Sequence, residues 1–106
     1  MKLTKKHLDN MAAEAIFDNA MEELRSIRNE DDKVYRLRHC TAWVYETDNY
    51  YILRSYNTYI AAIEKFSGWC GDVLRKVYGY TATSAQHVAK FVSDYGNRNK
   101  VYTWRY

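Results

Sequence analysis

The chain has 106 residues, of which 47% are hydrophobic, 27% charged and 16% aromatic, with a net charge of +3. This composition excludes a disordered polymer, and the sequence has no run of the roughly 18 uncharged apolar residues that a membrane span needs. Residues 1–32 carry five Lys/Arg against eight Asp/Glu, whereas residues 33–106 carry eleven against five. Phe17 is the only aromatic residue before residue 33. An acidic segment therefore precedes a basic, aromatic-rich one.

Residues 5–29 are predicted to form a helix. Alanine, methionine and glutamate residues favour it, and Thr4 precedes it as an N-cap. Apolar residues recur at alternating spacings of four and three, which gives one buried stripe: Ala13, Phe17, Ala20, Leu24 and Ile27. The polar run at 29–32 ends the helix.

From Val34 the hydrophobic period changes to two, and this alternation predicts one strand that continues to Glu46. A polar turn at 46–49 leads to a second predicted strand at 50–55. Tyr56-Asn57 is a tight turn, and a third strand follows at 58–64. Strands with such short connections favour an antiparallel meander.

Residues 66–71 are predicted as a loop or hairpin. Residues 72–78 are predicted as a short strand or irregular segment, although their apolar residues also fit one face of a helix. The tail at 101–106 alternates like a terminal strand, which could pair across a dimer.

A second helix is predicted over 84–95. Thr83 and Gln86 form a capping box at its start, and Gly96 follows its end. The chain is thus predicted to be a single α+β domain, 1–106. Its antiparallel sheet of three to five strands is packed by the long N-terminal helix and the second helix.

The two cysteines, Cys40 and Cys70, do not have the spacing of a metal site. No apolar segment follows the basic N-terminus, so we expect no secretory signal and two reduced thiols. These features predict a cytoplasmic protein that has no metal and no cofactor.

Three histidines, His7, His39 and His87, are the candidates for acid–base catalysis. His87 lies in the first turn of the second predicted helix, where the helix dipole favours a neutral ring. With Tyr and Arg side chains, His87 or His39 could support a metal-free RNase. No spacing singles out a triad, so we predict structural histidines, no catalytic residue and no enzyme.

The N-terminal helix carries Glu14, Asp18 and Glu22 at intervals of four residues. Like charges at this spacing repel, so a solvated outer face is the simplest interpretation. The functional interpretation is a negative ridge for a basic partner, such as a groove that binds nucleic acid.

The remaining chain has more aromatic rings than a thin core can hold, which predicts a contact surface for protein or nucleic acid. Its candidate residues are arginines and tyrosines after residue 33: Arg36, Arg54, Tyr56, Tyr59, Tyr78 and Tyr80. The start of the second helix could also hold an anion through Thr81, Thr83 and Ser84.

Two stretches, Ser55-Tyr56-Asn57-Thr58 and the YGYTATSAQH run at 78–87, resemble a family of small proteins from phages, prophages and plasmids of Gram-positive bacteria. No activity is established for that family. The resemblance implies a protein of a mobile element, and such proteins often block a host defence nuclease, as anti-CRISPR proteins do.

We therefore expect an inhibitor of a host protein such as a CRISPR effector nuclease, acting in the cytoplasm of a bacterial host cell as a monomer or homodimer away from membranes. A regulator that binds nucleic acid through the basic aromatic residues is the first alternative. The metal-free RNase is the second.

Overall fold

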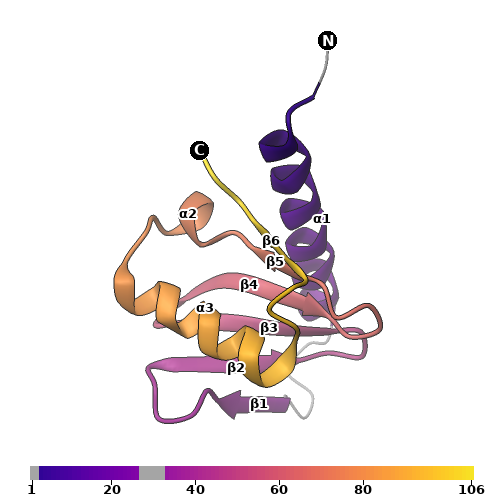
Figure 1. Cartoon of the computed structure of the whole chain (residues 1–106). Coiled ribbons are helices and arrows are strands. Elements are labelled where there is room, and N and C mark those ends of the chain that lie inside the picture. The colour runs from indigo at the N-terminus through magenta and orange to yellow at the C-terminus, as the bar shows by residue number, and fades with distance from the viewer. Residues whose placement is uncertain (1–2, 27–32) are drawn as a thin grey trace.

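A six-stranded sheet lies between two helices in the computed structural model, which describes residues 3–26 and 33–106 (Figure 1). The strands are neighbours in chain order: β1 (Lys33–Arg36), β2 (Ala42–Glu46), β3 (Tyr50–Ser55), β4 (Thr58–Glu64), β5 (Cys70–Asp72) and β6 (Val101–Thr103). All pairs are antiparallel except β5 and β6, which run parallel. The α+β class and the meander are confirmed, but the predicted number of strands was too low.

One missing strand arises because the predicted strand from Val34 to Glu46 is in fact two strands joined by a turn. Leu37 N donates to Ala42 O at 2.9 Å, and Arg38 has φ +53°, a left-handed backbone that reverses the chain. No glycine or proline marks this turn. Leu37 and Ala42 are five residues apart, so they would face opposite sides of a single strand, yet both enter the same core because the chain reverses between them.

The prediction for residues 72–78 was also wrong. β5 ends at Asp72, and a single helical turn, α2 (Leu74–Val77), follows. The Asp72 carboxylate accepts a hydrogen bond from Leu74 N at 3.0 Å, and the Leu74 side chain is buried. Tertiary burial of Leu74 thus decided between the helical and extended patterns that the sequence left open.

The two long helices cover opposite faces of the sheet (Figure 1). The N-terminal helix α1 (Lys5–Ser26) is confirmed as far as Ser26, and the predicted residues 27–29 lie outside the described residues. Helix α3 (Ala82–Tyr95) begins two residues before the predicted start. Its N-cap is Thr81, whose hydroxyl accepts from Ser84 N at 3.1 Å, rather than Thr83. No described helix is both long and apolar enough to cross a bilayer.

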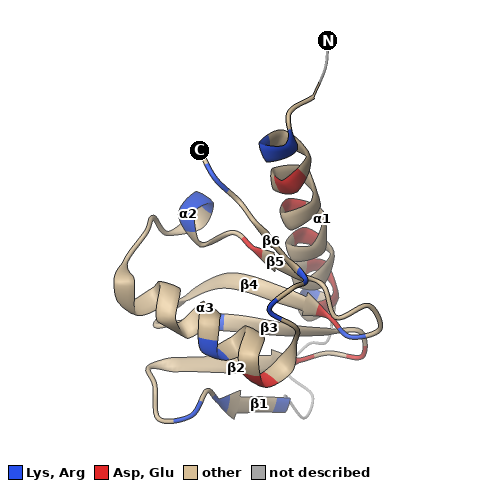
Figure 2. Cartoon of the chain, viewed as in Figure 1, with Lys and Arg blue, Asp and Glu red and all other residues tan. Residues whose placement is uncertain are grey.

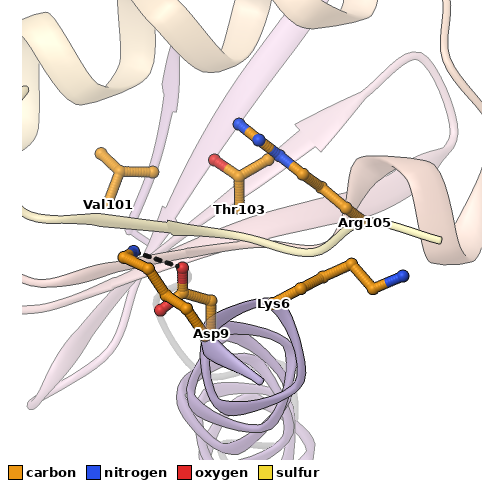
Figure 3. Close-up of a pocket in the computed structure, with 6 residues that line it drawn as sticks. Lys6, Asp9, Val101, Thr103 and Arg105 are labelled. Atoms are coloured by element: carbon orange, nitrogen blue, oxygen red, sulfur yellow. Dashed lines mark hydrogen bonds and ion pairs between the residues drawn. The ribbon is translucent and has the colours of Figure 1, made fainter.

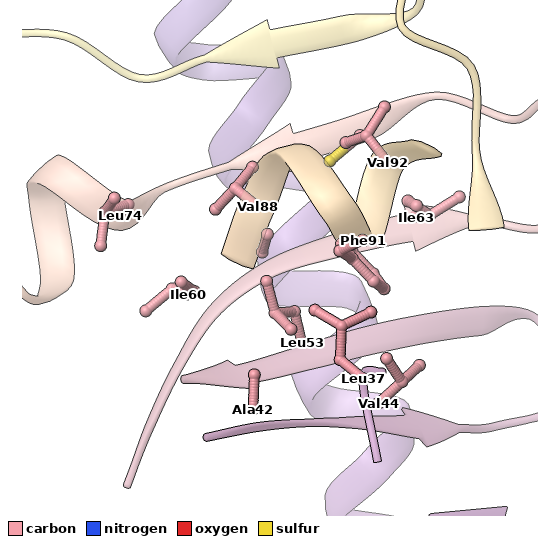
Figure 4. Close-up of a cluster of buried hydrophobic side chains, with 12 residues drawn as sticks. Leu37, Ala42, Val44, Leu53, Ile60, Ile63, Leu74, Val88, Phe91 and Val92 are labelled. Atoms are coloured by element: carbon pink, nitrogen blue, oxygen red, sulfur yellow. The ribbon is translucent and has the colours of Figure 1, made fainter. Parts of the chain in front are cut away.

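The larger core fills the space between α3 and the sheet (Figure 4). Phe91 is its largest fully buried side chain. It is surrounded by aliphatic residues of the strands, of α3 and of the turn after β1: Leu37, Val44, Leu53, Ile60, Ile63, Val88 and Val92. This packing fixes the position of α3 over β3 and β4.

A second core lies under α1, where Ile52, Tyr50 and Ala62 of the sheet meet Ala20 of the helix. The helix approaches β5 so closely that a Cβ atom on Gly71 would lie 2.5 Å from the carbonyl oxygen of Ala13. Small residues on both elements therefore set where α1 crosses the sheet.

Candidate functional site

Helix α1 packs against β3, β4, β5 and β6, so β1, β2 and the adjoining end of β3 extend beyond it (Figure 1). The strand register places Trp43 opposite Arg54 and Val34 opposite Tyr45 on the side of the sheet that faces α1. We call this uncovered part the open face. Its residues are Val34, Arg36, Trp43 and Arg54, with Tyr45 and Tyr59 at its border, where both are half-buried against the core under α1.

Arg54 lies at the centre of the open face. Its guanidinium carbon is 5.0 Å from the centroid of the Trp43 ring and 5.5 Å from that of Tyr45. The Tyr45 and Tyr59 rings meet edge to face, 5.3 Å apart. These contacts hold the cation against aromatic rings on adjacent strands.

Arg54 has a further distinguishing feature. Its Nε is the only fully shielded side-chain nitrogen or oxygen in the described part of the chain that has no hydrogen-bond partner. Its guanidinium takes part in none of the ion pairs between described residues. The shielded Nε cannot reach a partner outside the chain, but the other guanidinium nitrogens of this half-buried residue are open to an anion.

The open face is positively charged as well as aromatic. None of the residues that β1, β2 and β3 direct to this side is acidic. Glu46 points to the opposite side and pairs with Lys65 at 2.6 Å. Arg36 is exposed, and Figure 2 shows Lys or Arg at both ends of β1 and in the turn that follows it. The charge of this face suits an anionic partner.

The β3–β4 turn adjoins the open face. Tyr56 has φ +53°, a conformation that costs a residue with a side chain about 1–2 kcal/mol. Its ring is 40% exposed and lies 5.8 Å from the ring of His87. A bulky residue held in a strained turn often marks a functional position.

Beneath Tyr56, three buried polar side chains form a network. Ser55 Oγ lies 2.8 Å from His87 Nδ1 and 3.0 Å from Ser84 Oγ. All three residues are at most 3% exposed. Burial, with a smaller contribution from Lys90, lowers the pKa of His87 and favours the neutral ring.

This network bears on two of the sequence predictions. The pKa of His87 is lowered as expected, but by burial, and His87 lies in the second turn of α3 rather than in the predicted first turn. The ring is directed into the protein, and the other two predicted candidates, His7 and His39, are exposed. Of the predicted anion contacts, Thr81 caps the helix and Ser84 is buried, which leaves Thr83 exposed. The anion contact stays a prediction.

The segment that joins α2 to α3 lies at the same end of the sheet as the β3–β4 turn (Figure 1), and it contains Tyr78 and Tyr80. Both side chains are exposed, and the Arg75 guanidinium carbon lies 4.9 Å from the Tyr80 ring centroid. The structure thus places most of the predicted arginine and tyrosine contacts at one end of the molecule.

The predicted acidic ridge on α1 is interrupted. Glu14 pairs with Lys76 at 2.6 Å and accepts a hydrogen bond from Trp104 Nε1 at 3.1 Å. The Lys76 contact contributes most to a lowered Glu14 pKa. Asp18 and Glu22 are exposed, with no side-chain hydrogen bond or ion pair to another described residue.

A polar pocket of about 340 Å³ lies between the first turns of α1 and β6 (Figure 3). Lys5, Lys6 and Arg105 line it, together with Asp9. Lys5 pairs with Asp9 at 2.9 Å, and Lys6 Nζ donates to the Tyr106 carbonyl oxygen at 2.6 Å. Its lysines are therefore already engaged within the chain.

Residues 3–26 and 33–106 contain no group of three or more His, Cys, Asp or Glu side chains that could hold a metal ion. Cys40 and Cys70 are both free, and burial raises the pKa of Cys70. No family model, curated protein or solved structure matches this chain.

Sequence reasoning identified Arg36, Arg54 and Tyr59 but missed Trp43 and Tyr45, which complete the open face. A signal was present, because Trp43 and Tyr45 alternate on one strand and a short turn leads to the strand of Arg54. The position of α1, which leaves Trp43 beyond the helix and Tyr45 at the border of its core, could not be predicted from that pattern.

Proposed function

We propose that this protein binds single-stranded nucleic acid across the open face. The observation that carries the proposal is Arg54, a charged group held between Trp43 and Tyr45 with no acidic partner in the described chain. Aromatic rings that stack on bases, next to arginines that contact phosphates, are the usual means of binding single strands.

The surrounding residues support the same partner. Arg36 adds a second exposed cation beside Trp43, its register partner on β2. The absence of carboxylates on this side of β1, β2 and β3 removes the repulsion that phosphates would otherwise meet. Duplex DNA fits less well, because half-buried rings on a sheet can stack only on unpaired bases.

Fluorescence anisotropy with a labelled single-stranded oligonucleotide tests this proposal. Trp43→Ala should weaken binding by about 1–3 kcal/mol, the usual effect of removing one stacking ring. Arg54→Ala should weaken binding and lower the slope of log affinity against log salt by about 0.7, because one phosphate contact is lost.

Arg98→Ala is the matched control for charge. Arg98 is exposed and lies next to β6, at the opposite edge of the sheet from β1. Its loss should change affinity much less than Arg54→Ala. Equal effects of the two arginine variants, or no measurable binding at low salt, would refute a site on the open face.

The resemblance to proteins of mobile elements favours a second candidate function, inhibition of a host defence nuclease such as a CRISPR effector. Asp18 and Glu22 support it, since both are exposed on α1 without a partner in the described chain. They could occupy a basic groove of the nuclease.

Cleavage of target DNA by a purified CRISPR effector nuclease separates the two functions. An inhibitor would block cleavage, and the double variant Asp18→Lys, Glu22→Lys would lose the block while Trp43→Ala retained it. Undiminished cleavage with wild-type protein in excess would rule out inhibition of that effector and leave the oligonucleotide measurement unaffected.

A further inference from the structure

A groove of about 500 Å³ runs between α3 and β6, away from the open face and on the side of the sheet that α3 covers. Its apolar walls come from four residues of α3 and one of β6: Ala85, Val88, Ala89, Val92 and Val101. The remaining lining residues are polar or charged, so the groove has an apolar body and a polar end.

Asp72 supplies the acidic group of this groove. Its side chain is 7% exposed, although carboxylates are almost never buried without a partner. Only one of its oxygens has a hydrogen bond in the described chain, from Leu74 N at 3.0 Å. The second oxygen is not among the fully shielded atoms that lack a partner, so it opens to the groove.

The neighbours of Asp72 leave this oxygen unoccupied. Thr103 is its register partner on β6, and the Thr103 hydroxyl makes no hydrogen bond to described residues. Arg75 and, more weakly, Arg105 act on Asp72 through their charges, and Arg98 lines the groove, but none of the three forms an ion pair within the described chain. Figure 3 shows the Thr103 and Arg105 side chains on the same side of β6.

We propose that this groove binds a small ligand that carries an ammonium group on an apolar body. The ammonium would donate to the open oxygen of Asp72, and the body would lie against Val88, Val92 and Val101. A buried carboxylate with one free oxygen favours a cationic donor, because a charge-assisted hydrogen bond offsets the cost of burial.

Simple amines and free apolar amino acids share this chemistry. An amino acid would add a carboxylate, for which Arg98 is the nearest candidate in the lining of the groove. Both belong to the ligand class proposed here, and their relative affinities distinguish them.

Amide NMR of the labelled protein tests the proposal with phenethylamine as the probe. Phenethylamine at millimolar concentration should cause saturable shifts at Asp72, Val88 and Val101, whereas the uncharged phenethyl alcohol should not. Phenylalanine binding more tightly than phenethylamine would identify amino acids as the preferred source, and the reverse would identify simple amines. Phenylpropionate binding more tightly than either would overturn the proposal.

Two variants complete the test. Asp72→Asn keeps the acceptor for Leu74 N and should weaken phenethylamine binding at least about tenfold, as expected for a lost charged hydrogen bond. Ala89→Phe leaves Asp72 unchanged and should abolish binding by filling the groove, from an exposed position on α3 that tolerates a larger residue. Wild-type affinity in either folded variant, or no saturable shift in the native protein, would overturn the site.

Discussion

Ser55 Oγ lies 2.8 Å from Nδ1 of His87, and this contact ties the end of β3 to the second turn of α3. Removing the hydroxyl leaves the imidazole nitrogen and the Ser84 hydroxyl without this partner in a buried place. We expect Ser55→Ala to lower the free energy of unfolding in urea by about 1–3 kcal/mol. Ser93→Ala, at an exposed position of α3, is the control, and equal losses in both variants would contradict this role of Ser55.

His87 should also make stability depend on pH. Burial lowers its pKa below the ordinary value of 6.5, so the unfolded chain takes up the proton first as the pH falls. The contribution of His87 to the free energy of unfolding is fully present above pH 6.5, and it decreases as the pH falls toward the lowered pKa. His87→Gln should reduce this loss of stability at lower pH, measured by urea unfolding across this range. His39→Gln, at an exposed position, should leave the loss unchanged. Identical pH profiles of the wild-type protein and His87→Gln would refute the assignment.

Asp72 should make stability change with pH in the direction opposite to His87. Burial raises its pKa above 3.8, so the folded state holds the proton more tightly, and stability decreases as the pH rises through the raised pKa. Asp72→Asn should therefore be at least as stable as the wild-type protein at pH 7, with the difference shrinking at lower pH. Asp94→Asn should behave conversely, because a bidentate contact with Arg38 lowers the pKa of Asp94. Thermal unfolding over a pH series measures both, and the same sign for the two variants would contradict this prediction.

Gly71 fixes the distance between α1 and β5. Alanine there would place its Cβ 2.5 Å from the Ala13 carbonyl oxygen, a backbone atom that can move only with the helix. We expect Gly71→Ala to cost about 1–3 kcal/mol in urea unfolding. Gly96→Ala is a matched control, because its Cβ would meet the flexible end of Ile63 at 2.9 Å and should cost less. A larger loss in Gly96→Ala would contradict the close approach of α1.

Tyr56 tests whether its turn is strained. Glycine adopts a φ of +53° freely, whereas alanine keeps the strain and, like glycine, lacks the ring. Tyr56→Gly should therefore be more stable than Tyr56→Ala by about 1 kcal/mol. Urea unfolding of the two variants measures this difference, and a less stable glycine variant would show that the turn is relaxed.

The sequence alone predicted two central strands and the second long helix correctly. The strands 50–55 and 58–64 and the turn between them match β3 and β4, because alternation with a period of two is a local signal. Helix α3 was found within two residues of its start, since its apolar face repeats with helical spacing. The turn after Arg36 was not predicted because no glycine or proline marks it and a non-glycine residue, Arg38, adopts the positive φ.

The acidic helix and the basic, aromatic-rich sheet were determined by the sequence alone, because composition and hydrophobic period are properties of the chain. Only the tertiary structure decided which aromatic residues remain uncovered. Helix α1 crosses the sheet where Gly71 allows it to approach β5. It therefore covers β4, β5, β6 and part of β3, and Trp43 and Arg54 lie beyond it. The groove beside Asp72 likewise exists because β6, distant in sequence, pairs with β5 in parallel.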